Sequence, residues 1–387
     1  MKKKYLSTFQ NLFSKSLLFF LLLVMVINVL VPDKKTSYTE NRTLAQFPDF
    51  SMSKLQSGTF SKDLSKWFND QFIGRDTMIQ VKYIAQKLSG QKEINGVYLT
   101  RNGLIEDIEQ PNQEQLERKI DAINDFYRLY KVPTTFLLAP NNACVNRNRI
   151  SKNAPIRNQQ KLIDNFYDSL SSEIECIDVS STLKKHNDEY LYYKTDHHWT
   201  SLGAYYGFTA YASQLNLPMQ DLEKYQSMVA TKDFKGTLAS KVGSIGLRDE
   251  IDLLIAPDTP NYLLTNISDG SSKLTVYSSE GLESNNPYDV FFGGNHALLQ
   301  LELENESKKH LLIFKDSYAN SLIPFLLPYY RTITILDPRY CYDDITQIME
   351  KYLITEVLYC YNANTFFTDT SLADVIEYDH EAYGIED

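Results

Sequence analysis

Hydrophobic residues recur through the middle of this chain in patterns that alternate between helix and strand. Between residues 112 and 132 they lie three or four positions apart, which predicts an amphipathic helix ended by Pro133. The segment 134–139 is largely apolar and opens onto a polar loop, as a buried parallel strand does. A helix at 159–170 and a strand at 175–179 complete a β-α-β unit.

The same alternation returns near the C-terminus. Strands are expected at 310–314, 332–336 and 356–361, with helices at 319–327 and 345–352 between them. Strands that alternate with helices form a parallel sheet covered on both faces, so we predict an α/β fold. Because ligands bind such sheets beyond the carboxyl ends of the strands, the residues that follow each strand are the first candidates for a functional site.

The segment between these two regions is less regular. A helix is expected from about residue 200, capped by Thr200 or Ser201 and closed by Pro218. Beyond it the helical spacing disappears, and Gly, Ser, Asp and short apolar pieces dominate. We interpret residues 218–295 as a β-rich insertion over the site of a catalytic domain that spans residues 111–387.

The first 35 residues differ from the rest. Lysines at positions 2–4 and 15 precede an almost unbroken apolar run at 17–31. The run is shorter than the roughly 20 residues that a spanning helix prefers, so a cleaved signal peptide is one interpretation. No small-residue cleavage site follows the run, and we prefer an uncleaved anchor. Because positive charge stays inside, this predicts a cytoplasmic tail and a single-pass cell-membrane protein whose bulk is extracytoplasmic.

Residues 36–110 are expected to form a stalk with an N-terminal helix and a hairpin. Apolar residues recur at helical spacing within 64–72. Asn and Gly pairs at 95–96 and 102–103 flank a short apolar strand, as in a hairpin. This segment would link the anchor to the catalytic domain.

Charge and cysteine spacing exclude two classes of function. The formal net charge is -10 and no long Lys/Arg stripe follows the N-terminus, so a nucleic-acid partner is not expected. No cysteine lies in a C-x-x-C pair or near a His cluster with zinc spacing. Most lie in or beside apolar runs, so free buried thiols are preferred over disulfides. The four cysteines are Cys144, Cys176, Cys341 and Cys360.

Two segments carry residues suited to nucleophilic catalysis. Asp196 and His198 are two positions apart, so an extended segment would present both side chains on one face. Ser317 follows a predicted strand at a turn into a helix, where unpaired N–H groups can stabilise an oxyanion. Together these residues form a triad: the imidazole deprotonates the serine, and the carboxylate orients the imidazole and stabilises its charge.

Each part of this constellation also has a simpler interpretation. A serine after a strand is usually a helix cap, and His197, His198 and Trp199 could form a buried packing patch. His197 could instead join Asp196 and His198 as a zinc ligand, but no further ligand with metal-like spacing is present. Because these residues fall at the ends of predicted elements in one α/β domain, we favour the triad and expect neither a metal nor a cofactor.

The same residues resemble a known family. The run Asp196, His197, His198, Trp199 has the signature of the DHHW protein family, and the segment 315–320 resembles its serine block. That family is similar to the alginate O-acetyltransferases, whose SGNH-hydrolase-like domain carries an Asp-x-His motif ahead of a Gly-Asp-Ser block. The resemblance covers nearly the whole extracytoplasmic part and includes residues 40–42, 95–99, 292–295 and 337–340.

The resemblance implies a role for each matching position. Asp196 takes the place of the acid, His198 of the base and Ser317 of the nucleophile, on an SGNH-hydrolase-like parallel sheet flanked by helices. Lys315 stands where the serine block usually has glycine, which changes what is expected of the turn. The order Asp, His, Ser is the reverse of that in ordinary SGNH esterases, so the site would be a permuted version.

Several other residues are candidates for oxyanion or substrate binding. The backbone N–H of Ser317 or Tyr318 comes first, and the Asn295 side chain, which follows two glycines, could supply an amide. Asn142, in the loop after the strand at 134–139, competes with it. His197, beside the predicted triad, is a further candidate. Arg339 could hold an acidic sugar or pair with a neighbouring aspartate, and we favour the pairing.

The resemblance implies serine-dependent transfer of an acyl group, most simply acetyl, to or from a hydroxyl of a cell-surface or exported polysaccharide. It also implies a membrane-spanning partner that donates the acyl group. Transferase and esterase stay open, because the sequence does not show what excludes water. Two alternatives remain: a non-catalytic, surface-anchored carbohydrate-binding or assembly protein, and a metallohydrolase built on Asp196, His197 and His198.

Overall fold

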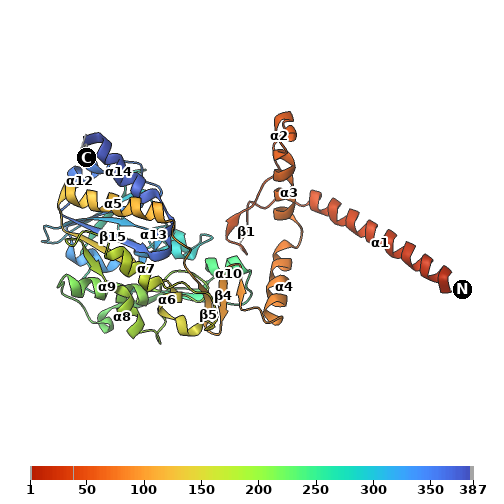
Figure 1. The fold of residues 1–387 in the computed structure, drawn as a ribbon, viewed down its shortest axis with the longest axis horizontal. Helices are drawn as coiled ribbons and strands as arrows, with labels where there is room; N and C mark the ends of the chain where they lie inside the picture. The colour runs from red at the N-terminus through yellow and green to blue at the C-terminus, as the bar shows by residue number, and fades with distance from the viewer. Residues whose placement is uncertain (1, 38, 384–387) are drawn as a thin grey trace. The chain divides into compact units, whose positions relative to one another are not determined.

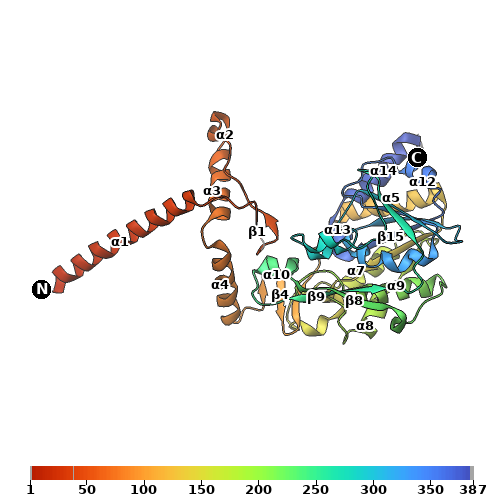
Figure 2. The ribbon, with the colours of Figure 1, turned by 180° about the vertical axis from the view of Figure 1, so that it is seen from behind.

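The computed structural model describes residues 2–37 and 39–383, and the chain forms two compact units. The first comprises Met1–Gln91 together with Ser240–Ile245, and the second comprises Lys92–Ala239 and Gly246–Asp387. Every residue predicted for the functional site belongs to the second unit. Figures 1 and 2 show the elements of both units, coloured along the chain.

Helices dominate the first unit. The N-terminal helix α1, Lys2–Leu30, contains a portion, Gln10–Leu30, that is long and apolar enough to cross a membrane, which is compatible with a single-pass anchor. The helix predicted around 64–72 is part of α3. Helix α4 was not predicted, although its apolar residues Met78, Val81, Ile84 and Leu88 recur at helical spacing. The remaining elements are β1, Thr36–Ser37, β2, Arg42–Thr43, α2, Met52–Gln56, α3, Thr59–Gln71, and α4, Arg75–Leu88.

An eight-stranded sheet forms the centre of the second unit, in the order β11-β10-β12-β14-β13-β15-β6-β7. The five strands from β14 to β7 run parallel, as predicted. Their carboxyl ends therefore share one edge. The strands are β6, Thr134–Ala139, β7, Glu175–Ile177, β10, Tyr262–Asn266, β11, Ser272–Lys273, β12, Leu298–Leu303, β13, His310–Lys315, β14, Thr332–Leu336, and β15, Glu356–Asn362.

The other three strands correct the prediction of a purely parallel sheet. Strands β12, β10 and β11 pair antiparallel and extend the sheet beyond β14. Part of the 218–295 segment therefore belongs to the main sheet and does not cover the site. The sequence of this segment shows only that helical spacing is lost. It does not show which sheet its strands join, because that depends on pairing with residues far away in the chain. The rest of the segment includes a separate two-stranded sheet of β8, Gln226–Phe234, and β9, Asp249–Ile255.

Helices cover both faces of the sheet (Figures 1 and 2). On one face, Phe126 and Phe166 pack against Phe136 and Tyr359 of the sheet. The elements of this face are α5, Gln113–Tyr130, α7, Gln159–Tyr167, α12, Ile345–Lys351, α13, Ala363–Thr368, and α14, Ser371–Tyr383. The opposite face is covered by α8, Val179–Lys185, α9, Ser201–Gln214, and the 3-10 helix η5, Ile323–Tyr329.

The α-helix predicted at 319–327 is absent from its place after β13. Two 3-10 helices occupy it instead: η4, Ser317–Ser321, and η5. Pro324 and Pro328 explain the difference, because a proline has no N–H to donate and its ring clashes with the preceding turn of an α-helix. The nucleophile candidate therefore lies at the first residue of a short, tight helix.

Smaller elements complete the second unit. The predicted hairpin is found as a three-stranded sheet of β3, Glu93–Ile94, β4, Val97–Thr100, and β5, Gly103–Glu106. All four cysteines are free, as expected. Its remaining elements are the short helices α6, Asn142–Val145, η1, Arg147–Arg149, η2, Leu222–Lys224, α11, Ser279–Leu282, and η3, Pro287–Val290. Helix α10, Thr237–Val242, begins in the second unit and ends in the Ser240–Ile245 segment of the first.

Candidate active site

Ser317 lies at the carboxyl edge of the sheet, two residues beyond the end of β13. The preceding Asp316 is the N-cap of η4: its Oδ1 accepts a hydrogen bond of 2.9 Å from the backbone N–H of Tyr318. Its Oδ2 accepts one of 3.0 Å from the N–H of Asn362, at the end of β15. Two neighbouring strand ends thereby hold the turn, and Ser317 remains partly exposed between buried neighbours.

Asp196 and His198 lie in a tight loop, not in the extended segment that the sequence suggested. An isolated antiparallel bridge between Tyr192 and Trp199 closes this loop. Within it, Asp196 Oδ1 accepts a 3.0 Å hydrogen bond from the backbone N–H of His198. A short acidic side chain readily stabilises a turn by accepting from the backbone two residues ahead, and this brings the carboxylate beneath the imidazole.

The three predicted triad residues form one continuous hydrogen-bonded chain. His198 Nδ1 lies 2.5 Å from Asp196 Oδ1, and His198 Nε2 lies 2.8 Å from Ser317 Oγ. An ionised carboxylate can only accept, so Nδ1 carries the proton and Nε2 of the neutral ring accepts from the serine hydroxyl. Asp196 and His198 are buried, whereas Ser317 is accessible, as a nucleophile must be.

The second oxygen of Asp196 is bound by the loop after β8. Asp196 Oδ2 accepts hydrogen bonds from the backbone N–H of Thr237 at 2.7 Å and from its hydroxyl at 2.9 Å. Gly236 permits this approach, because a Cβ there would lie 2.2 Å from the Cβ of Asp196. Burial raises the pKa of Asp196, but the nearby imidazoles of His197 and His198 and these hydrogen bonds outweigh it and lower the pKa below its usual value.

Asp249, the first residue of β9, fixes the start of the same loop. Its carboxylate accepts from the backbone N–H groups of Lys194 and Thr195 at 3.0 and 2.7 Å, and from the Thr195 hydroxyl at 2.5 Å. Asp249 is itself buried. The β8–β9 region therefore supports the Asp196 loop through both Thr237 and Asp249.

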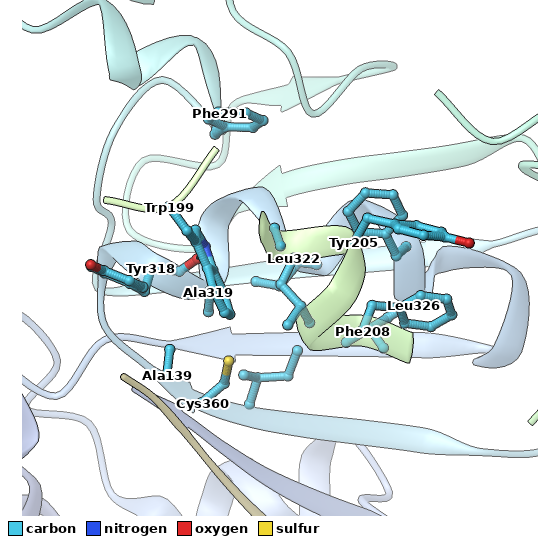
Figure 3. Close-up of a cluster of buried hydrophobic side chains, with 14 of the residues drawn as sticks. Ala139, Trp199, Tyr205, Phe208, Phe291, Tyr318, Ala319, Leu322, Leu326 and Cys360 are labelled. Carbon is cyan, nitrogen blue, oxygen red and sulfur yellow. The ribbon is translucent and has the colours of Figure 1, made fainter. Parts of the chain in front are cut away.

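Trp199 joins the two segments of the site. Its indole Nε1 donates to the carbonyl of Tyr318 at 3.0 Å and to Ser321 Oγ at 2.9 Å, both on η4. Figure 3 shows the indole lying against Tyr318 and Ala319 within the hydrophobic cluster beneath the site. Tyr288 supports the imidazole from another direction, since its ring stacks on His198 with 3.8 Å between the ring centroids.

His197 borders the triad but forms no part of its hydrogen-bonded chain. Its Nδ1 lies 2.7 Å from the Thr237 hydroxyl, its carbonyl accepts from the Tyr318 hydroxyl, and its side chain is 34% exposed. Loss of solvent and the nearby His198 lower the pKa of His197 to about 4. His197 is the residue with which Asp196 and His198 could share a metal, because one ligand atom from each lies within 4.8 Å of the others.

Lys315 lies in a buried polar cluster beside the turn that carries Ser317. Its ammonium donates to Asp337 Oδ2 at 3.2 Å and to Asn295 Oδ1 at 2.9 Å. Arg339 binds the same Asp337 through Nε and Nη2, which is the pairing preferred from the sequence. Asn320 also donates to Asn295 Oδ1, at 3.2 Å. The lysine that replaces the usual glycine thus ties strand β13 to the loop that carries Asn295.

Asn142 is in a different environment from Asn295. Its Oδ1 accepts from Asn146, and it lines a cavity of about 480 Å³ with residues of the β4–β5 turn and the segment that leads to Lys194. The neighbouring Asn141 is the one connected to the Ser317 turn: its Oδ1 accepts from Asn362, whose backbone N–H binds Asp316.

Sequence reasoning missed several residues that support the site. Asn141 follows strand β6 and Asn362 ends strand β15, so the strand-end rule that selected Ser317 could also have selected them. Thr237, Asp249 and Tyr288 lie in the irregular 218–295 segment, where no periodic pattern distinguished them from other polar or aromatic residues.

Comparison with known proteins supports the resemblance. The sequence model described as "DHHW protein" matches residues 40–132 and 130–336. A DHHW family protein from Eubacterium siraeum shares 20% identity, with a TM-score of 0.63 over 74% of this chain and 96% of its own. Bacillus cereus PatB1 with a sulfonyl adduct shares 18%, with a TM-score of 0.60 over 71% and 97%.

A third structure, the O-acetyltransferase domain of Pseudomonas putida AlgJ, shares 15% identity, with a TM-score of 0.45 over 73% of this chain and 99% of its own. No curated protein sequence matches the chain. The family match spans most of the sequence and includes the Asp196 loop and the Ser317 turn. The chain belongs to the DHHW protein family.

Proposed function

We propose that this protein is a membrane-anchored, extracytoplasmic serine enzyme that transfers an acetyl or similar acyl group to or from a polysaccharide hydroxyl. The observation that carries the proposal is the hydrogen-bonded chain from Ser317 through His198 to Asp196 at the carboxyl edge of the sheet. The residues come from two segments that are 119 positions apart in the sequence, the loop of Asp196 and His198 and the turn of Ser317. Each segment is also held by further hydrogen bonds.

The geometry supports a two-step acyl transfer. Ser317 Oγ attacks the acyl carbonyl while its proton passes to His198 Nε2, and the leaving oxygen takes that proton as the acyl-enzyme forms. His198 then deprotonates the acceptor, a sugar hydroxyl or water, which attacks the acyl carbon and releases Ser317 with its proton restored. Asp196 stays ionised throughout, because its lowered pKa keeps the carboxylate ready to stabilise the imidazolium.

We propose the Ser317 backbone N–H and the Asn295 side-chain amide as the donors to the oxyanion. The Tyr318 N–H already donates to Asp316, which leaves the Ser317 N–H and the Asn295 amide. Because Lys315 and Asn320 both donate to Asn295 Oδ1, the amide is held with its NH₂ group directed away from them. Such fixed donors stabilise developing negative charge without reorganisation during the reaction.

The polysaccharide substrate rests on the likeness of the DHHW motif and serine block to those of alginate O-acetyltransferases. A sulfonyl adduct, as described for PatB1, is the kind of modification that an activated nucleophile undergoes, and Ser317 is the candidate for that role in this chain. The anchor and a membrane-spanning acyl donor belong to the same proposal. Helix α1 and the lysines before its apolar portion support the anchor.

Turnover of p-nitrophenyl acetate tests the proposal. Ser317→Ala and His198→Ala are expected to lower kcat at least about a thousandfold. Two control variants are expected to retain the wild-type kcat: Ser227→Ala, at an exposed position on β8, and His186→Ala, at the partly exposed C-cap of α8. Equal turnover in all variants would favour the non-catalytic carbohydrate-binding alternative. Activity that a chelator abolishes and zinc restores would favour the metallohydrolase. Acetylated glycan formed in the presence of acceptor distinguishes transferase from esterase.

A further inference from the structure

The first unit exposes apolar side chains along one side of α4. Met78, Val81, Ile84 and Leu88 are 56%, 58%, 41% and 82% exposed. Their spacing of three or four positions places them in one continuous stripe, which we call the α4 stripe. The helix packs through a different side, where Tyr83 is buried. An apolar face that no described residue covers indicates a surface for another partner.

A second group of exposed apolar residues precedes α4. It lies on the segment that leads into α2, on α2 itself and on α3, and consists of Phe47, Phe50, Met52, Leu55 and Phe68. The aromatic rings among them contact others, since Phe47 meets Trp67 edge-on and Phe50 meets Phe60 in the same way. Phe and Leu side chains are typical of the apolar face of helices that lie at the boundary between lipid headgroups and acyl chains.

Two hydrogen bonds hold α3 and α4 at the end of α1, one to a residue of α1 and one to the segment that follows it. The backbone N–H of Ile73, at the corner between α3 and α4, donates to the buried Asn28 Oδ1 at 2.7 Å. Trp67 on α3 donates to Asp33 Oδ2 at 2.7 Å. At 1.5 Å per residue, the apolar portion of α1 is about 31 Å long, roughly the thickness of the hydrocarbon core. Asn28 is two residues from its end, so the α3–α4 corner lies at the membrane interface.

The charge of this region is opposite to that of the rest of the extracytoplasmic chain. Residues 31–91 contain nine Lys and Arg against six Asp and Glu, whereas residues 92–387 contain 26 against 43. Lys82 and Lys87 are exposed on α4 itself. A helix with an apolar stripe and lysines beside it is typical of segments that lie in the plane of an anionic lipid surface.

We propose that α2, α3 and α4 form a platform that rests on an anionic lipid bilayer. The α4 stripe and the exposed aromatics enter the boundary between headgroups and acyl chains, and the lysines bind lipid phosphates. The inference rests on the anchoring of α1 proposed above. A second copy of the chain or a membrane protein are the other occupants of this face, and both predict that lipid does not reach it.

Quenching by lipid tests the platform in the full-length protein. The protein would be reconstituted into vesicles of phosphatidylcholine and phosphatidylglycerol whose acyl chains carry bromine, a contact quencher of tryptophan. Leu88→Trp places the probe on the α4 stripe. Leu274→Trp is the matched control, because Leu274 is equally exposed, at 79%, in the second unit. The native Trp67 and Trp199 give the background, which wild-type protein measures.

The platform predicts that the added Leu88→Trp emission is at least about twofold weaker in brominated than in ordinary vesicles, and that the Leu274→Trp emission is unchanged. Combining Lys82→Glu with Lys87→Glu is expected to reduce the quenching. Flotation of the vesicles reports on α1 separately. Protein that floats but shows equal quenching at both probes overturns the platform while the anchor stands, and protein that does not float overturns both.

Discussion

The indole Nε1 of Trp199 lies 3.0 Å from the carbonyl oxygen of Tyr318, and this contact joins the loop of Asp196 and His198 to the turn of Ser317. The same N–H also reaches Ser321 Oγ, so two polar groups of η4 are bound from beneath the site. We therefore expect the aromatic residue of the family signature to hold His198 and Ser317 at the distance that the proposed mechanism requires.

Replacing Trp199 by phenylalanine tests that function. The variant keeps an aromatic ring but loses both hydrogen bonds, so we expect kcat for p-nitrophenyl acetate to fall about tenfold or more, with little change in KM. The free energy of unfolding should fall by roughly 2–4 kcal/mol, because the Tyr318 carbonyl and the Ser321 hydroxyl each lose a hydrogen-bond donor and the smaller ring leaves a cavity. An unchanged kcat in a destabilised variant would show that Trp199 supports only the fold.

Thr237→Val removes the hydroxyl that binds Asp196 and His197, and it keeps the shape of the side chain. The backbone N–H of Thr237 still binds Asp196, so the carboxylate is only partly released. We expect kcat to fall about tenfold and the variant to remain folded. Thr209→Val on α9 is the control, since its hydroxyl binds only the carbonyl of Tyr206 in the same helix. Equal effects from the two substitutions would contradict a role for Thr237 at the site.

Lys315→Met leaves Asp337 paired with Arg339 alone and removes a donor from Asn295. We expect a loss of about 2 kcal/mol in the free energy of unfolding together with a lower kcat, because the Asn295 amide is no longer fixed. Lys309→Met removes a surface ion pair with Glu356 and should cost less than about 1 kcal/mol. Denaturant unfolding and turnover measured on both variants check this, and similar values for the two would contradict it.

Lys119 gives the protein a specific dependence on pH. Burial lowers the pKa of its ammonium to about 8, whereas in the unfolded chain the pKa is about 10.4. Between these values the unfolded chain binds more protons, so stability from this group rises with pH, by up to roughly 3 kcal/mol. Urea unfolding near pH 7.5 and pH 10 should show a larger gain for wild type than for Lys119→Met. Lys161→Met, an exposed control, should behave as wild type does.

Features of the fold that depend on neighbouring residues could be predicted from the sequence, whereas features that depend on contacts between distant residues could not. Strands β6, β13, β14 and β15 are short, largely apolar segments bounded by polar residues, so their positions and the Ser317 turn at the carboxyl edge were predictable from local pattern. Asp196 and His198 were recognisable because both lie in one short motif. Their arrangement in a tight loop was not, since it depends on the bridge between Tyr192 and Trp199.

The supporting residues depend on distant contacts that no local pattern contains. Thr237 binds a carboxylate 41 positions away, and Asp249 binds the backbone of Thr195 54 positions away. The antiparallel addition of β12 to β14 is likewise fixed by pairing across the sheet. The replacement of an α-helix by η4 and η5 was predictable in principle, because Pro324 and Pro328 are visible in the sequence.

The central claim is that Ser317 is a nucleophile activated by His198. Its most direct test is intact-protein and peptide mass spectrometry of the full-length protein after brief exposure to p-nitrophenyl acetate. We predict one acetyl group on Ser317 in wild type and in Ser227→Ala, none at that position in Ser317→Ala, and far slower labelling in His198→Ala. Labelling that is equal in all four proteins, or that falls on residues other than Ser317, would contradict the account.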